Sequence, residues 1–205
     1  MSTLALIRQG IARQDPRIGT QAFSAPVMLL FSIGGACLTG LLAQVRVPMP
    51  GTFVPFTGQV FAVLICGALL GIGYGALSQA IYVALGAAGL PWFTGGGAGM
   101  SWFMAGTGGY LIGFVVAALF LGCCTRRAAL ARTFQGQVML MLAAVAVIYT
   151  FALLHLTLNL GMSLGAAVKA GVMPFVLLDV LKVALAAPIT SALLRSPSPL
   201  PASAR

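Results

Sequence analysis

Charged side chains are scarce in this sequence. Of its 205 residues 6% are charged and 60% are hydrophobic, and the mean hydropathy is +1.06. A soluble domain carries roughly 25% charged residues. There is no glutamate, and the two acidic residues are Asp15 and Asp179. A chain without a charged surface is not a soluble domain, so we predict an all-α integral membrane protein.

Groups that carry catalytic or metal chemistry are also few. His155 is the sole histidine and has no serine or cysteine beside it, so a nucleophilic active site is not expected. One histidine and one acid in the apolar part of the chain do not make a metal site, and we predict no cofactor. His155 and Asn159, four residues apart, are expected to form a packed, hydrogen-bonded pair. No GxxxxGK[ST] sequence occurs, so ATP-driven work must come from a partner.

Apolar segments follow one another along the chain. A helix needs about 20 residues to cross a hydrocarbon core of roughly 30 Å, and the segments have about that length or a little less. They are 25–44, 58–73, 75–91, 106–124, 137–160 and 173–194. The sequence therefore predicts a six-helix transmembrane bundle, a substrate-binding membrane domain over 25–194. Because the second and third segments are short and joined by the turn GIGYG, a single bent hairpin there is the alternative.

The arginines and lysines predict how these spans are oriented. The net charge of +9 would suggest nucleic acid in a soluble protein, but here the basic residues lie between apolar segments, which indicates membrane topology and anionic lipid. Arg46 and Lys169 fall on one side of the membrane. The side of both termini holds Arg8, Arg13, Arg17, Arg126, Arg127, Arg132, Arg195 and Arg205. The positive-inside rule therefore predicts a cytoplasmic segment 1–24 and a disordered cytoplasmic tail 195–205, in a multi-pass protein of a bacterial plasma membrane.

The two connections on the opposite, outer side have an unusual composition. One is VRVPMPGTFVPFTGQ (45–59), and the other is GLPWFTGGGAGMSWFMAGTGGY (89–110), rich in glycine and aromatic residues. Long loops of this kind are typical of a binding surface or lid. Re-entrant turns with interfacial aromatic anchors have a similar composition, and composition alone does not separate the two explanations.

Asp179 and Lys182 lie within the last apolar segment, three residues apart and so on one face of a helix. Asp179 is about 10 Å along a helix that enters near Val172, in the outer third of the membrane. An ionisable group there costs about 3 kcal/mol or more unless it is paired or hydrated. A self-neutralising pair that only holds the bundle together is one explanation. Because intramembrane charges usually line a cavity, we favour a polar pocket beneath the outer loops, suited to a small ligand with N–H donors and oxygen acceptors.

The first apolar segment carries small residues at every fourth position, Ser32, Ala36 and Gly40. Such a seam lets another helix approach closely. The approaching helix belongs either to this chain's own bundle or to a separate subunit, and spacing alone favours neither.

At these residues the chain resembles the BioY family, the substrate-binding S components of energy-coupling factor (ECF) biotin transporters. The similarity covers VPFTGQVFAVLICGALLG (54–71), YVALGAAGLPWFTGG (82–96), GTGGYLIGF (106–114) and DVLKVALA (179–186), which occur in the family's order. The D-x-x-K and G-x-x-G-L-P-x-F stretches are the most specific of these.

The resemblance implies a subunit that captures biotin near the outer face for an ECF-type ABC importer. Its implied partners are a membrane T component and a pair of ABC ATPases. The substrate-binding residues it implies are Asp179, Lys182, Gln59, Trp92, Phe93 and Tyr110. We expect Phe56 to help cover the ring system of biotin, and Thr57 to belong to the same site. It also assigns the seam Ser32, Ala36 and Gly40 to the contact with the T component.

The sequence departs from the family's pattern at two places that concern the ligand. The first outer loop reads VPFTGQ where V-P-x-T-L-Q is expected, so Gly58 loosens that turn. The second outer loop has no asparagine or basic residue where some relatives supply one. Arg46 and Lys169 are the other outer cations and neither is predicted to reach the pocket, so the carboxylate of biotin has no assigned partner.

Two other functions are compatible with the same residues. One is an S component for another vitamin, such as thiamine or riboflavin. The other is a self-sufficient facilitator or channel, in which Asp179 and Lys182 would line a conduction path. A membrane enzyme is the least consistent, because a nucleophile–base arrangement is missing from the sequence.

Overall fold

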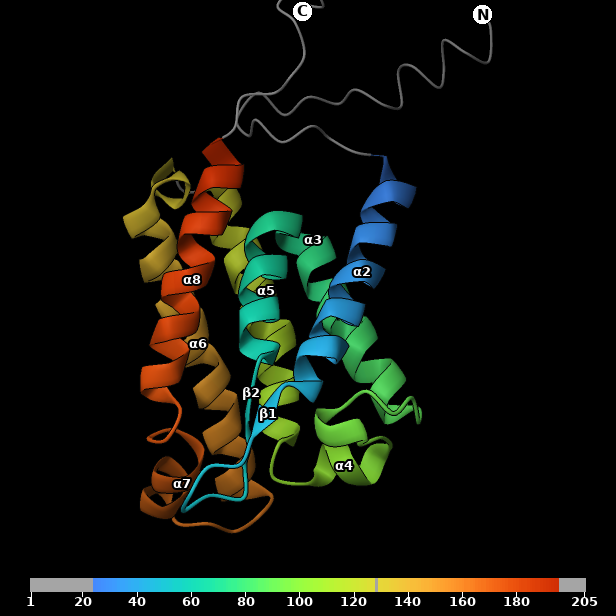
Figure 1. Cartoon of the computed structure of the whole chain (residues 1–205), viewed down its shortest axis with the longest axis vertical. Helices are drawn as coiled ribbons and strands as arrows, with labels where there is room; N and C mark the ends of the chain where they lie inside the picture. The colour runs from blue at the N-terminus through green and yellow to red at the C-terminus, as the bar shows by residue number, and fades with distance from the viewer. Residues whose placement is uncertain (1–23, 128, 196–205) are drawn as a thin grey trace, which may run out of the picture.

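The computed structural model describes residues 24–127 and 129–195 as a helical bundle with one short β-ribbon (Figure 1). The long helices are α2 (Ala25–Gln44), α3 (Gln59–Ala87), α5 (Gly108–Arg127), α6 (Phe134–Leu158) and α8 (Val176–Arg195). The short elements are β1 (Arg46–Val47), β2 (Phe56–Thr57), η1 (Thr94–Gly96), α4 (Met100–Met104), η2 (Ala129–Arg132) and α7 (Leu164–Gly171). The predicted segments 1–24 and 195–205 lie outside the described residues, apart from Ser24 and Arg195.

The surface of the bundle is apolar. Five of its helices are long and apolar enough to cross a membrane. Large aliphatic side chains point outward from them, such as Leu30, Leu158 and Leu177, which are 66%, 77% and 79% exposed. Water does not favour such a surface, whereas lipid does. The prediction of an all-helical membrane protein is therefore confirmed.

Helix α3 doubles back on itself near its middle (Figure 1). The backbone breaks at Gly71, whose φ of 81° and ψ of −172° belong to a region that essentially only glycine adopts. Gln59 Nε2 donates to the hydroxyl of Tyr82 at 2.6 Å, although a straight helix would separate these residues by about 34 Å. The predicted segments 58–73 and 75–91 are thus one bent hairpin, and the prediction of six separate spans is not confirmed.

The arms of this hairpin are shorter than a full membrane span. At 1.5 Å per residue they are about 18 Å and about 24 Å long, against a hydrocarbon core of roughly 30 Å. They pack tightly, because a Cβ at Gly75 would lie 2.9 Å from the carbonyl oxygen of Cys66. Bare backbone at Gly75 therefore allows the two arms to touch near the turn.

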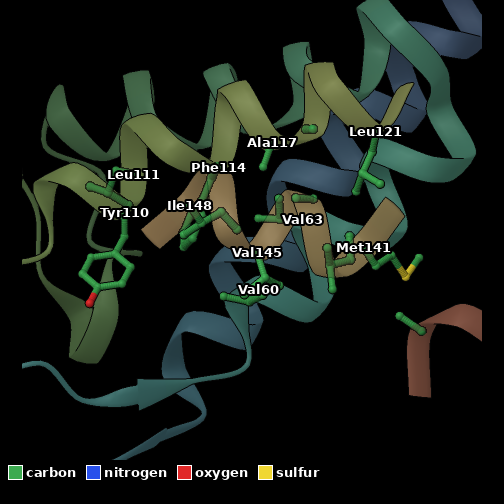
Figure 2. Close-up of a cluster of buried hydrophobic side chains, with 14 of the residues drawn as sticks. Val60, Val63, Tyr110, Leu111, Phe114, Ala117, Leu121, Met141, Val145 and Ile148 are labelled. Atoms are coloured by element: carbon green, nitrogen blue, oxygen red, sulfur yellow. The ribbon is translucent and has the colours of Figure 1, made fainter. Parts of the chain in front are cut away.

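The apolar core lies where α3, α5 and α6 pack against one another (Figure 2). The side chains there are at most 1% exposed in Leu64, Leu121, Met141 and Ile148. Gly113 lets α5 approach α6 closely, since a Cβ at that position would lie 2.9 Å from Ile148 Cα. Figure 2 shows Tyr110 at one end of this cluster, with its hydroxyl pointing away from the apolar side chains.

The small-residue seam of α2 packs inside the chain's own bundle. Ser32 and Ala36 are fully buried, and Ser32 Oγ donates to the carbonyl of Tyr74 at 3.0 Å. A Cβ at Gly40 would lie 3.0 Å from the ring of Trp92. In this structure the chain covers these three positions itself, and the assignment of Ser32, Ala36 and Gly40 to a contact with a T component stays a prediction.

Helix α8 begins later than the sequence predicts. Residues 172–175 form a turn, and the helix starts at Val176, because the residue before Pro174 disfavours the α conformation. Asp179 consequently lies in the first turn of α8, about 5 Å from the helix start rather than about 10 Å. A carboxylate is stabilised there by the helix dipole.

The two unusual connections meet at one end of the bundle. The start of α2 and the end of α8 lie at the opposite end, while the β-ribbon, α4 and α7 lie together (Figure 1). We call the latter the loop end; its segments are 45–58, 88–107 and 159–175. In the ribbon, β1 and β2 run antiparallel with Arg46 opposite Thr57. The first turn of α8, with Asp179, also lies at the loop end.

The break at Gly71 makes a prediction about stability. Gly71→Ala places a Cβ on a backbone conformation that only glycine adopts readily, so we expect a loss of about 1–3 kcal/mol in the free energy of unfolding. The thermal midpoint in detergent should fall by several degrees. Gly73→Ala is the matched control, because Gly73 has nothing within 4 Å of its Cβ position. Equal midpoints for the two variants would contradict the kink.

Candidate functional site

A pocket at the loop end gathers residues from distant parts of the chain. It lies between the β-ribbon, both arms of α3, the start of α5 and the start of α8. Its lining residues are Val54, Pro55, Phe56, Thr57, Gln59, Val60, Tyr82, Phe93, Thr94, Trp102, Thr107, Tyr110, Leu111, Phe114, Phe175, Asp179 and Lys182. We call this the inner pocket. Its cavity volume is about 40 Å³, enough for about three water molecules.

A buried ion pair forms the polar wall of the inner pocket. Lys182 Nζ donates to Asp179 Oδ1 at 2.7 Å, and the two residues are 7% and 3% exposed. The hydroxyl of Tyr149, from α6, donates to Asp179 Oδ2 at 2.5 Å. Both carboxylate oxygens thus already accept a hydrogen bond, and each retains a lone pair for a further donor.

The ammonium of Lys182 also lies over an aromatic ring. Its Nζ is 4.1 Å from the centroid of Phe56, a distance at which the ring quadrupole attracts a cation. Lys182 has three N–H donors and Asp179 takes one of them. The ring of Phe56 therefore forms part of the environment of the ammonium, beside the carboxylate of Asp179.

A neutral hydrogen-bond network forms the second polar wall. Gln59, 5% exposed, accepts from Thr57 Oγ1 at 2.8 Å and from Thr94 Oγ1 at 3.3 Å. Its amide nitrogen donates to the hydroxyl of Tyr82. Because both ends of the amide are occupied, the orientation of Gln59 is fixed. The network ties the β-ribbon, the two arms of α3 and the loop after α3 to one side chain.

Aromatic side chains complete the wall on the α3 side. Phe93 is 1% exposed and meets Tyr82 edge-on at 5.5 Å between ring centroids. Trp92 packs against the other side of Tyr82 at 5.3 Å. The indole N–H of Trp92 donates to the carbonyl of Tyr82 at 2.9 Å, so this ring is fixed between α2 and α3 and does not line the pocket.

Two hydrogen bonds hold α7 against the pocket. The hydroxyl of Tyr110 donates to the carbonyl of Gly171, and Thr52 Oγ1 donates to the carbonyl of Ala170 at 2.7 Å. Through these bonds the last turn of α7 contacts both the start of α5 and the segment before β2. The loop end is therefore linked across its width.

The loop between α4 and α5 is held by His155. Its Nε2 is 2.9 Å from the carbonyl of Ala105, and its Nδ1 is 2.9 Å from Asn159 Nδ2. The prediction of a packed, hydrogen-bonded His155–Asn159 pair is confirmed. The structure adds a contact that the spacing did not predict: His155 holds the segment around Ala105, which borders the pocket.

A second and larger cavity adjoins the inner pocket. It has a volume of about 640 Å³, and we call it the vestibule. Its lining residues are Arg46, Pro48, Met49, Thr52, Phe53, Val54, Pro55, Thr94, Trp102, Ala105, Gly106 and Thr107. Five of these also line the inner pocket, namely Val54, Pro55, Thr94, Trp102 and Thr107. The two cavities thus adjoin each other, with these five residues lining both.

The structure brings together most of the residues that the sequence singled out. Asp179, Lys182, Gln59, Phe56, Thr57, Phe93 and Tyr110 all line the inner pocket, whereas Trp92 does not. Sequence reasoning missed Tyr82, Thr94, Trp102 and Tyr149. Tyr149 carried a signal, as a hydroxyl in a nearly apolar span, but its distance from Asp179 in sequence gave no reason to pair them.

The chemistry of the inner pocket suits recognition of a small polar molecule. It offers a carboxylate acceptor, an ammonium donor and a fixed amide, surrounded by aromatic and aliphatic walls. Such a combination of apolar walls with a few convergent polar groups is typical of ligand sites. Serine, cysteine and histidine are not among its lining residues.

Comparison with known proteins gives consistent relatives. The chain is 40% identical over 134 residues to a probable biotin transporter BioY of Methanothermobacter thermautotrophicus, covering 62% of this chain and 85% of the relative. It is 35% identical over 134 residues to the biotin transporter BioY of Thermotoga maritima, covering 65% and 77%. With the biotin transporter BioY of Rhizobium etli it shares 31% over 157 residues, covering 74% and 83%.

A solved structure has the same fold. The crystal structure of the S-component for biotin from an ECF-type ABC transporter superposes with a TM-score of 0.78, covering 90% of this chain and 96% of that one at 22% sequence identity. At that identity the likeness shows the fold alone. The BioY family model matches residues 19–198, nearly the whole chain, and this chain therefore belongs to the BioY family.

Proposed function

We propose that this protein is the biotin-binding, substrate-capture subunit of an ECF-type ABC importer and that the inner pocket holds the vitamin. The observation that carries the proposal is the buried Asp179–Lys182 pair, which lies in a pocket at the loop end of a BioY family chain. The relatives are named as biotin transporters, and the structure of similar fold is the S-component for biotin.

The functional groups of biotin match the two polar walls. Its ureido ring has two N–H donors and a carbonyl acceptor, and its fused ring is apolar. In the proposed complex Asp179 accepts from a ureido N–H, and Lys182 donates to a ligand oxygen. Gln59 and Thr57 supply neutral contacts, while Phe56, Phe93 and Tyr110 enclose the ring system. In this proposal Trp102, which lines the pocket, makes the aromatic contact that the sequence predicted for Trp92.

The pocket must enlarge before it takes up a bicyclic ligand. A cavity of about 40 Å³ holds about three waters, far less than a vitamin. The shared wall of the inner pocket and the vestibule contains Trp102, which is 37% exposed, and Val54, which is buried. In our proposal the segments 45–58 and 88–107 move apart to admit biotin and close over it afterwards.

The direction of transport follows from the proposed orientation. The protein spans a bacterial plasma membrane in this proposal, with the loop end facing the outside and both termini in the cytoplasm. The distribution of arginine supports this orientation. A membrane T component and ABC ATPases then supply the work of transport, since the chain has no phosphate-binding loop.

Replacement of the carboxylate tests the site directly. Asp179→Asn removes the charge that neutralises Lys182 and replaces the carboxylate acceptor for the ureido N–H with a weaker, neutral amide oxygen, so the Kd for biotin should rise by more than about tenfold. The measurement is calorimetric titration of the purified chain in detergent, with the thermal midpoint recorded on the same samples. An unchanged Kd in a folded Asp179→Asn protein would exclude the assignment.

A milder variant covers the case in which Asp179→Asn does not fold. Tyr149→Phe keeps the ion pair and removes the hydroxyl that donates to Asp179 Oδ2, so we expect a loss of about threefold to tenfold in affinity. Thr150→Val is the matched control, because the Thr150 hydroxyl bonds only within its own helix, to Ala146. Equal affinities for the two variants would argue against the carboxylate contact.

The two tryptophans of the chain report on different places. Trp102 lines both cavities, whereas Trp92 is fixed between α2 and α3. In Trp92→Phe, biotin should shift and quench the emission of the remaining Trp102. In Trp102→Phe, emission from Trp92 should stay nearly constant during the same titration. A response from Trp92 alone would place the ligand elsewhere.

The competing functions give different results in two simple assays. Titration with thiamine or riboflavin should produce no binding heat, whereas an S component for another vitamin would bind one of them in preference to biotin. Uptake of labelled biotin by empty proteoliposomes that contain the chain alone would favour a self-sufficient facilitator.

A further inference from the structure

The vestibule contains one charged side chain. Arg46 lines it together with apolar and hydroxyl-bearing residues. Asp179 is the one acidic residue in the part of the chain that the structure describes, and it pairs with Lys182 and Tyr149. Arg46 therefore has no acidic partner among the described residues, and it is an exposed residue.

The position of Arg46 is fixed by the fold. In the ribbon it lies directly opposite Thr57, so their Cβ atoms are about 5 Å apart on one face. Thr57 lines the inner pocket and donates to Gln59. The guanidinium lies over the bare backbone of Gly95, where a built Cβ would overlap its Nη1. Gly95 has a φ of +70°, a conformation in which glycine is favoured.

The vestibule also suits an aliphatic chain. Met49, Phe53 and Trp102 supply apolar walls of the vestibule, and Trp102 also lines the inner pocket. A molecule whose polar ring reached Asp179 and whose hydrocarbon tail ran outward would pass these side chains. An acid at the end of that tail would meet a guanidinium, which binds carboxylate through paired N–H donors.

The geometry points to Arg46 as the residue that binds the carboxylate of the ligand's tail, with the vestibule as the tail's binding site. This inference rests on the proposed function and adds a specificity determinant to it. The chain lacks a basic residue in the loop 94–103, so the cation comes from β1 instead. The protein should consequently prefer the free acid of biotin to forms in which the tail is an amide.

A cycle of two ligands and two proteins tests the inference. The ligands are biotin and biotinamide, whose tail is neutral, and the proteins are the wild type and Arg46→Gln. Arg46→Gln should weaken biotin binding about threefold to tenfold, the range for a partly exposed charge pair, and leave the Kd for biotinamide unchanged. Arg46→Lys should retain part of the preference. Added salt should reduce the preference of the wild type for the acid.

Lys169→Gln is the matched control. Lys169 is an exposed cation of α7 and does not line either cavity, so its loss should affect both ligands equally little. An unchanged Kd for biotin in Arg46→Gln, or equal losses for biotin and biotinamide, would overturn the role of Arg46 while the proposed function stands. A wild type that binds neither ligand would overturn the proposed function and this inference together.

Discussion

The buried contact between Asp179 and Lys182 is the constraint on which the loop end depends. Two charges that are almost fully removed from solvent are costly unless every lone pair and proton finds a partner. Tyr149 from α6 and the ring of Phe56 from the β-ribbon complete the environment of the pair. The ion pair therefore connects α6, α8 and the first connection, and removal of either charge would leave the other buried alone.

The same arrangement explains how a rigid bundle carries an adaptable site. The core of α3, α5 and α6 is closely packed, and the segments at the loop end are joined to it by hydrogen bonds to Gln59, Tyr110 and His155. Buried apolar side chains of those segments, such as Val54 and Phe93, also pack into the core. Hydrogen bonds of this kind exchange one by one at modest cost. The proposed enlargement of the pocket requires these hydrogen bonds to exchange while the core of α3, α5 and α6 stays packed.

Local features of the sequence predicted much of this architecture. Apolar runs predicted α2 with its observed bounds and the approximate positions of α5, α6 and α8, whereas two of the six predicted segments form the single bent helix α3. An isolated charge pair predicted the position of the pocket's polar wall. The rest depends on contacts between distant residues. Trp92 does not line the pocket because it packs against Gly40, and Arg46 lies at the vestibule because β1 pairs with β2. Neither contact has a signature in spacing or composition.

A structure of the protein determined with biotin bound is the most direct test of the account. It should show a ureido nitrogen about 2.7–3.2 Å from the carboxylate of Asp179, with the ring system enclosed by Phe56 and Phe93 and the tail carboxylate beside Arg46. Biotin bound outside the inner pocket, with the Asp179–Lys182 pair unchanged and out of contact with the ligand, would contradict it.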